Sequence, residues 1–322
     1  MNTKEKVVVM GHRLPDADSF GAAIGIYRAA KTLNKKAYIV IDNPTSSIIP
    51  LMNTFRDNQD YEADMFVNNH EAKEIMDDNT LLVVVDTNKP SITQCEDLLY
   101  MAKMIVVLDH HRQGSDTIRN SVLSYIEPYA SSASEMVAEI LQYFTEGIRI
   151  RNVEADSIYA GIMIDTDNFM QKTGVRTFEA AAFLRRCGAD VTRVRKLFRE
   201  DMNDYKARGE TIRNAELFRG QFAISECPSD YVDSPTVVGA QAANELLNIV
   251  GVKASFVLTE YKGVIYISAR AIDEVNVQII MERMGGGGHL NMAGCQLETV
   301  NMEGARNLLK STLTEMQDGG EI

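Results

Sequence analysis

Three apolar runs near the start of the chain each end abruptly in acidic or imidazole side chains. They cover residues 7–10, 81–85 and 104–108. Uninterrupted apolar runs of this length are typical of parallel strands that are buried on both faces of a sheet. Between the first two runs, from Phe20 to Leu33, apolar residues recur at helical spacing. The alternation predicts an α/β fold with a doubly wound, mostly parallel sheet.

A densely charged segment separates this pattern from a second one. Residues 192–219 carry scattered apolar positions among many charges, which we interpret as a long connecting helix. Beyond it, the sequence predicts short strands at 221–224, 236–238, 255–259 and 263–269, and helices at 241–250, 275–284 and 302–316. A chain of 322 residues is long enough for two domains. We expect a first domain over 1–191 and a smaller α/β domain over 220–322, joined by the 192–219 helix.

Charge and cysteine content narrow the classes of function. The 33 basic and 45 acidic residues leave a net charge of −12, whereas proteins that bind long nucleic acids usually carry a basic surface. A small substrate is therefore favoured over long nucleic acid. The four cysteines are widely spaced and form no CxxC pair, which is typical of a reducing compartment. With no signal peptide and no apolar stretch of ~18 residues, the sequence predicts a cytoplasmic chain that makes no membrane contact itself.

The polar side chains that follow the buried runs form one candidate site. They are His12, Asp16, Asp18, Asp86, Asp109, His110, His111 and Asp165. Ligands bind at the carboxyl ends of the strands in sheets of this kind. Several carboxylates converging there would repel one another unless divalent cations reversed the local charge balance. Mixed imidazole and carboxylate ligands suit Mn²⁺ or a similar metal, so the pattern predicts a two-metal hydrolase site.

Each of these motifs also has a simpler interpretation. A single aspartate after an apolar strand is usually a helix cap or a turn former. A lone histidine is more often structural than catalytic. The metal interpretation depends on the motifs occurring together in chain order at α/β spacing.

Four consecutive glycines, from Gly285 to Gly288, precede His289. Glycine inside a helix or strand costs about 0.5–1 kcal/mol relative to alanine, so we predict a tight loop whose amides approach a ligand. The alternative is a flexible hairpin turn. Arg270 follows a predicted strand and is a candidate phosphate ligand, although a surface charge remains the alternative.

Five motifs in order resemble the DHH phosphoesterase family with its associated C-terminal domain. They are GHRLPDADS (11–19), VVVDTN (83–88), LDHHR (108–112), GIMIDTDNF (161–169) and GGGGHLNMAG (285–294). The resemblance covers nearly the whole chain. Within the family, residues 127–141 and 173–190 are similar to the catalytic part of GdpP-type cyclic-di-AMP phosphodiesterases. In those proteins membrane helices and other regions precede this part.

The resemblance implies a role for each site residue. One metal would be held by His12, Asp16 and Asp86. The other would be held by Asp18, Asp86, His110 and Asp165, with Asp86 bridging the pair. His111 would sit beside the metals or touch a phosphate, and Asp109 would orient the two histidines. Catalysis would rest on Asp86, His110 and His111, and substrate binding on Arg270, Gly286, Gly287, Gly288 and His289.

The activity implied by the resemblance is hydrolysis of cyclic di-AMP to linear pApA, by attack of a metal-activated water on phosphorus. The expected cofactors are two divalent metal ions, and Mn²⁺ is the metal we expect. Relatives that share the same metal motifs are short-oligoribonucleotide exonucleases or 3′-phosphoadenosine phosphate phosphatases, and this alternative stays open. A non-catalytic nucleotide sensor is the alternative from another class. The resemblance also implies a homodimer, and a chain that acts in the cytoplasm as the catalytic part of a membrane-anchored protein.

Overall fold

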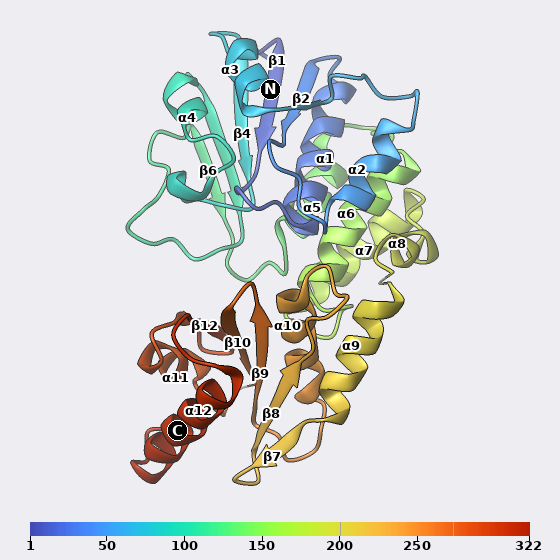
Figure 1. The fold of residues 1–322 in the computed structure, drawn as a ribbon. Helices are drawn as coiled ribbons and strands as arrows, with labels where there is room; N and C mark the ends of the chain where they lie inside the picture. Colours follow the sequence, from blue (N-terminus) through green and yellow to red (C-terminus); the bar gives the residue numbers. More distant parts are fainter. Residues whose placement is uncertain (200, 273) are drawn as a thin grey trace. The chain divides into compact units, whose positions relative to one another are not determined.

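The computed structural model describes residues 1–199, 201–272 and 274–322. It divides the chain into two compact units, Met1–Arg199 and Glu200–Ile322, each with its own sheet (Figure 1). Among the described residues, no helix combines the length and the apolar character that crossing a membrane would need. All four cysteines are free.

The first unit is built on a six-stranded sheet with the order β3-β2-β1-β4-β5-β6. Its strands are β1 (Lys6–Met10), β2 (Lys36–Val40), β3 (Phe66–Val67), β4 (Thr80–Val85), β5 (Ile105–Asp109) and β6 (Leu123–Ile126). Every neighbouring pair is parallel. The predicted α/β class and parallel sheet are therefore confirmed, and the three apolar runs are β1, β4 and β5.

Helices cover both faces of this sheet (Figure 1). They are α1 (Ala17–Thr32), α2 (Ile49–Arg56), α3 (Asn69–Ile75), α4 (Asp97–Met101), α5 (Ala133–Phe144), α6 (Asn152–Asp165), α7 (Val175–Arg186) and α8 (Val191–Leu197), with a 3₁₀ turn η1 (Pro90–Ile92). Successive β1 side chains point to opposite faces. Val7 and Val9 join one apolar cluster with α1, α5 and α6, while Val8 and Met10 join another with α4.

Close packing of α1, α5 and α6 brings two predicted ligands toward one point. A Cβ atom at Gly161 of α6 would lie 2.2 Å from the Ser134 hydroxyl of α5 and 3.0 Å from the Ala17 carbonyl of α1. A side chain at this position would therefore push the three helices apart. Because α1 begins beside Asp18 and α6 ends at Asp165, the glycine helps to set the spacing between those carboxylates.

The second unit also contains a six-stranded sheet, with the order β11-β12-β10-β9-β8-β7. Its strands are β7 (Glu216–Phe218), β8 (Phe222–Cys227), β9 (Ala254–Tyr261), β10 (Val264–Ala271), β11 (Gly287–His289) and β12 (Met292–Leu297). Only the β8–β9 pair of this sheet is parallel. Its helices are α9 (Met202–Arg213), α10 (Pro235–Leu246), α11 (Val277–Arg283) and α12 (Met302–Asp318). A second, smaller α/β domain was expected and is present.

Two predicted elements of the chain's later part are wrong. The single helix over 192–219 is replaced by α8, α9 and β7, and residue 200 lies outside the described residues. A new helix starts because the Asp201 carboxylate accepts hydrogen bonds from the backbone amides of Asn203 and Asp204. The strand predicted at 236–238 is part of α10, where Pro235 occupies the first helical turn that its fixed φ favours.

Candidate metal centre

The first two candidate ligands lie on the loop between β1 and α1. The side-chain amide of Gln94 donates to the His12 carbonyl at 2.9 Å, and His12 also forms an isolated bridge with Thr93. Asp16 caps α1, because its carboxylate accepts a hydrogen bond of 2.9 Å from the Ser19 amide. The loop is thus held at both ends before any cation binds. Gln94 was not singled out in the sequence, since nothing local marks a glutamine 82 residues from its partner.

Asp18 is buried at the N-terminus of α5. Its two carboxylate oxygens each accept a hydrogen bond of 2.7 Å, one from the Ala133 amide and one from the Ser134 amide. The helix N-terminus stabilises negative charge. Burial nevertheless raises the pKa of Asp18 well above its usual value, and the charges of Asp86 and Asp165 raise it further. The two amides therefore do not fully offset the cost of placing a negative charge on Asp18.

Asp86 lies at the centre of the cluster, directly after β4. Its Oδ2 atom is 3.2 Å from His12 Nε2, and its Oδ1 atom is 3.3 Å from His110 Nε2. Oδ1 is buried and has no hydrogen-bond partner in the described part of the chain. The residue has a φ of +58°, a backbone conformation that aspartate tolerates better than most residues. Burial favours a raised pKa for Asp86, but the His110 and His12 rings lower it to about 2.

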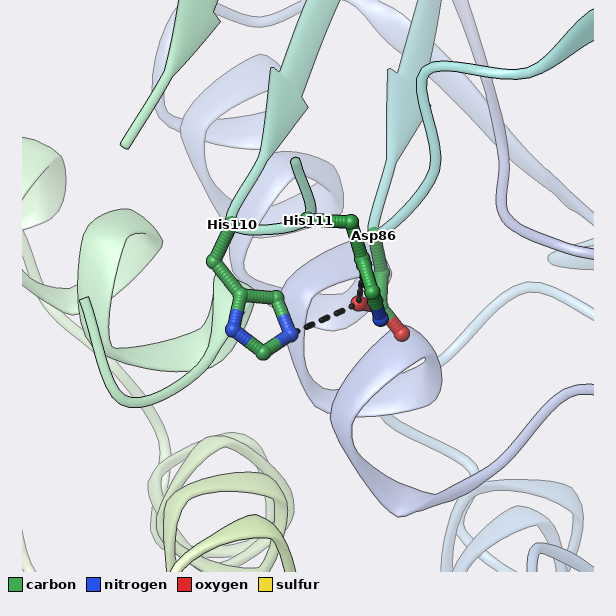
Figure 2. A group of neighbouring side chains, drawn as sticks. All are labelled: Asp86, His110 and His111. Atoms are coloured by element: carbon green, nitrogen blue, oxygen red, sulfur yellow. Dashed lines mark ion pairs between the residues drawn. The ribbon is translucent and has the colours of Figure 1, made fainter. Parts of the chain in front are cut away.

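His110 and His111 approach Asp86 from the end of β5, the neighbouring strand (Figure 2). The rings of the two histidines lie with centroids 4.4 Å apart. His110 Nε2 is also 3.7 Å from Asp18 Oδ2 and 3.6 Å from Asp165 Oδ2. His111 Nδ1 is 3.6 Å from Asp86 Oδ1. Asp86 therefore lies between the two histidines that follow β5 and the loop that carries His12.

Three overlapping groups place their ligand atoms within 4.8 Å of one another. They are His12 with Asp16 and Asp86, Asp18 with His110 and Asp165, and Asp86 with His110 and His111. All six residues predicted to hold metals from the sequence are brought together here. The remaining aspartate of the candidate site, Asp109, is absent from these groups.

The protonation of this cluster shows what kind of ligand it suits. Burial alone lowers the pKa of a histidine, but Asp16 and Asp86 raise that of His12 to about 10. Asp86 and Asp18 likewise raise the pKa of His110 to about 9 against the effect of burial. Burial raises the pKa of Asp165 to about 6. The carboxylates thus draw positive charge into the site, and their combination with imidazole nitrogens fits a first-row divalent cation.

Asp109 contacts a histidine and an asparagine instead. Its side chain is 0% exposed, and its Oδ1 atom accepts hydrogen bonds from the His111 amide at 3.1 Å and from His111 Nδ1 at 2.8 Å. Its Oδ2 atom accepts a bond of 2.5 Å from the Asn88 side chain. Asn88 lies inside the VVVDTN motif, but the sequence gives no sign of this partner.

Comparison with known domains identifies both units. Residues 6–162 match the DHH family, N-terminal domain, and residues 222–315 match the DHHA1 domain. This chain carries a DHH domain followed by a DHHA1 domain. The site described above lies within the matched DHH region except for Asp165, which follows it by three residues.

The chain is similar to proteins with different activities. It is 42% identical over 320 residues to the cyclic-di-AMP phosphodiesterase GdpP of Bacillus subtilis, covering 98% of this chain and 48% of that protein. It is 24% identical over 324 residues to the bifunctional oligoribonuclease and PAP phosphatase NrnA of Thermus thermophilus, covering 98% of this chain and 92% of that protein. The chain therefore spans about half the length of GdpP.

A solved structure shares this fold. An exopolyphosphatase-related protein from Bacteroides fragilis superposes with a TM-score of 0.79 at 20% identity. The superposition covers 98% of this chain and 93% of that one.

The glycine run of the DHHA1 domain is not the loop predicted from the sequence. Gly287, Gly288 and His289 form β11, an edge strand antiparallel to β12. A Cβ atom at Gly286 would lie 2.1 Å from the Gly294 carbonyl oxygen, and one at Gly288 would lie 2.4 Å from the Ala293 Cα atom. Glycine is therefore required where the hairpin backbone approaches β12. Of the two interpretations, the structure agrees with the hairpin.

Arg270 is a half-buried cation on β10. Its guanidinium donates to the neighbouring Ala269 carbonyl at 2.9 Å, and its Nε atom is buried with no partner among the residues that the structure describes. Burial lowers its pKa. On the same sheet, Ser268, Gly286 and Gly294 help to line a cavity of about 430 Å³. A guanidinium whose buried Nε atom lacks a partner in the described part of the chain favours an anionic ligand in this unit.

Proposed function

We propose that the chain is a phosphodiesterase that hydrolyses cyclic di-AMP to linear pApA at the DHH site. The observation that carries this proposal is the convergence of three groups of ligand atoms, two of which share Asp86 while the third is linked to them through His110. The similarity to GdpP over 98% of the chain supports the choice of cyclic di-AMP. The more distant NrnA relatives keep the short-oligoribonucleotide and PAP alternatives as the second candidate. All six predicted ligands lie together, so a non-catalytic sensor is disfavoured.

Six residues would hold two divalent cations. His12, Asp16 and Asp86 would form one set, and Asp18, His110 and Asp165 would form the other, with Asp86 joining it through its contact with His110. Asp86 suits a bridging role because its two oxygens face different histidines. Cations bound here would supply Lewis acidity, lowering the pKa of water and neutralising phosphoryl charge. The nitrogen and oxygen donors suit Mn²⁺, which we propose as the metal.

His111 is the residue we propose to meet the scissile phosphate directly. Its Nδ1 atom is engaged by Asp109, so Nε2 is the ring nitrogen that remains for a phosphoryl oxygen. The side chain is 56% exposed, in contrast to the 8% of His110. An exposed ring beside a buried ligand is placed to reach substrate.

Substrate contacts in the DHHA1 domain are part of the same proposal. Arg270 would bind a phosphate through its guanidinium, whose Nε atom has no partner among the described residues. Gly286 would contribute the wall of the 430 Å³ cavity, and Gly287 and Gly288 would form the hairpin that presents the exposed His289. We also propose that the chain acts as a homodimer in the cytoplasm, a reducing compartment that suits its four free cysteines. Light scattering of the purified chain tests the dimer.

The activity is tested with the purified chain and four substrates: cyclic di-AMP, cyclic di-GMP, pApA and a tetraribonucleotide. Each is incubated with Mn²⁺, Mg²⁺ or Zn²⁺, and products are separated by chromatography. We expect cyclic di-AMP to be consumed fastest, with Mn²⁺, and pApA to accumulate. Faster consumption of pApA than of the cyclic substrate would establish the oligoribonuclease alternative.

Two aspartate variants provide the matched control. Asp86→Asn removes one charge from the centre of the cluster, and we expect a loss of turnover of at least roughly 1,000-fold with an unchanged fold. Asp116→Asn changes an exposed aspartate that accepts a hydrogen bond from the Ser91 hydroxyl, and it should keep full activity. Equal activity of the two variants would show that Asp86 does not serve as proposed.

A further inference from the structure

Asn88 follows β4 and contacts Asp109 at the end of the neighbouring strand β5. It is 2% exposed, and its side-chain amide donates to Asp109 Oδ2 at 2.5 Å and to the His111 carbonyl at 3.2 Å. Its own carbonyl accepts a hydrogen bond of 2.9 Å from the Ile118 amide, on the loop that follows His111. Asn88 therefore contacts the segment that carries His111 through both its side chain and its backbone.

The contact with Asp109 determines how that carboxylate faces His111. One Asp109 oxygen is taken by Asn88, and the other accepts from the amide and the Nδ1 atom of His111. Asp109 is 0% exposed, so solvent cannot replace a lost donor without rearrangement. With both oxygens engaged, the carboxylate has one orientation. That orientation keeps the proton of His111 on Nδ1 and leaves Nε2 for a ligand.

The other half of the Asn88 amide argues against a role in packing alone. Its Oδ1 atom is buried and finds no partner within the described ranges. A buried acceptor without a partner destabilises the fold, and an apolar residue here would avoid that cost. Reversing the amide would place Oδ1 against the Asp109 carboxylate, so the donor orientation is the one compatible with the network. Asn88 thus leaves its Oδ1 atom without a partner because its NH₂ group is turned toward Asp109.

We propose that Asn88 is a positioning residue that acts on His111 through Asp109. It fixes the Asp109 carboxylate, which fixes both the tautomer and the direction of the His111 ring. The kinetic part of this inference rests on the proposed phosphodiesterase activity, whereas the tautomer part does not.

The tautomer is measured by nitrogen-15 NMR of the histidine rings in the full chain with Mg²⁺, which is diamagnetic. The chain has only 5 histidines, so a signal lost in His111→Ala identifies that ring. We expect a single Nδ1-protonated form of His111 in the unaltered protein and a mixture of tautomers in Asn88→Ala. Asn120→Ala is the matched control, because Asn120 donates to the Leu99 carbonyl away from the site. An unchanged His111 signal in Asn88→Ala overturns the proposal.

Kinetics then separate positioning from a general loss of structure. Asn88→Ala should lower kcat about 10- to 100-fold, the range typical of residues that orient a site residue, with KM within about threefold. In a His111→Ala background the same change should cost less than about twofold, because the ring it positions is gone. An equal loss in both backgrounds would mean that Asn88 acts through the fold, and the proposal would fail.

A second variant covers the case in which Asn88→Ala does not fold. Asn88→Ser keeps a short donor, and it should retain a larger share of the Nδ1-protonated His111 form than alanine does. If the unaltered chain does not cleave cyclic di-AMP but the tautomer shifts as expected, the proposed function fails and the role of Asn88 stands. If the chain cleaves cyclic di-AMP but the His111 tautomer is unchanged in the variants, the proposed function stands and the role of Asn88 fails.

Discussion

Asp18 of α1 accepts a hydrogen bond of 2.7 Å from the backbone amide of Ala133, the first residue of α5. The Ser134 amide binds the other Asp18 oxygen at the same distance, and the Ser134 hydroxyl donates to the Asp18 carbonyl at 3.0 Å. A candidate metal ligand is thus also the link between two core helices. This double role connects cation binding to the stability of the first unit.

We expect Asp18→Asn to reduce the cation-induced rise in Tm. The amide group of asparagine removes a ligand charge and turns an NH₂ toward backbone donors, so metal affinity should fall about 10- to 100-fold or more. In the metal-free protein the variant should lower Tm by less, because it also removes the repulsion between Asp18 and the carboxylates of Asp86 and Asp165. Thermal unfolding with and without Mn²⁺ measures both effects. A cation-induced shift equal to that of Asp116→Asn would contradict the ligand role.

Arg270 should act on substrate binding more than on turnover. We expect Arg270→Ala to raise KM for the dinucleotide at least about tenfold, since a charged hydrogen bond to phosphate is lost, with a smaller change in kcat. Arg270→Lys should recover only part of the affinity, because an ammonium lacks the planar fork of the guanidinium. Arg219→Ala removes a partly exposed arginine that pairs with Asp318 and serves as the control. Unchanged KM in Arg270→Ala would exclude a phosphate contact.

Gly288 and Gly287 should respond differently to alanine. At Gly288 the new Cβ would lie 2.4 Å from Ala293 Cα and 2.5 Å from the Met292 carbonyl oxygen, and φ is +148°. Both contacts are with backbone, so we expect a loss of about 1–3 kcal/mol in the free energy of unfolding. Gly287→Ala meets nothing within 4 Å and should be nearly neutral. Denaturant unfolding of the two variants measures the difference, and equal stabilities would show that β11 does not pack against β12 in this way.

Glu62 should make stability depend on acidic pH. Burial alone would raise the pKa of Glu62, but hydrogen bonds from Lys31 and Tyr27 lower it from 4.5 to about 2. A lowered carboxyl pKa stabilises the folded state above the unfolded pKa, and that contribution is lost as pH falls from about 4.5 toward about 2. The stability difference between the unaltered protein and Glu62→Gln should therefore be constant near neutral pH and shrink below about pH 4.5.

Unfolding curves at several pH values test this expectation. Glu298→Gln changes an exposed glutamate of the second unit and should show no such pH-dependent difference. A difference for Glu62→Gln that grows as the pH falls would have the wrong sign for a lowered pKa.

The sequence was sufficient to predict the parallel sheet and a cluster of polar side chains at its edge, whereas the choice of six of them as metal ligands came from the resemblance to the DHH family and remains a proposal. A buried parallel strand is apolar at every position, so its end is visible as the first polar residue, as at Asp86. The carboxyl ends of parallel strands share one edge, which is why Asp86, His110 and the loop with His12 could be expected together. The end of a strand is a property of one element, and the shared edge is a property of the fold class. The local pattern of apolar and polar residues indicates both.

Only the tertiary structure decided which neighbours each polar group has. Asp109 and Asp86 end adjacent strands alike, yet Asp109 is taken by Asn88 and His111 and does not join the ligand groups. Asp18 is held by amides 115 and 116 residues away, and the close approach of β12 places two glycines of the run in a strand. Such contacts depend on how separate elements pack and align, and local periodicity carries no information about partners so distant in the chain.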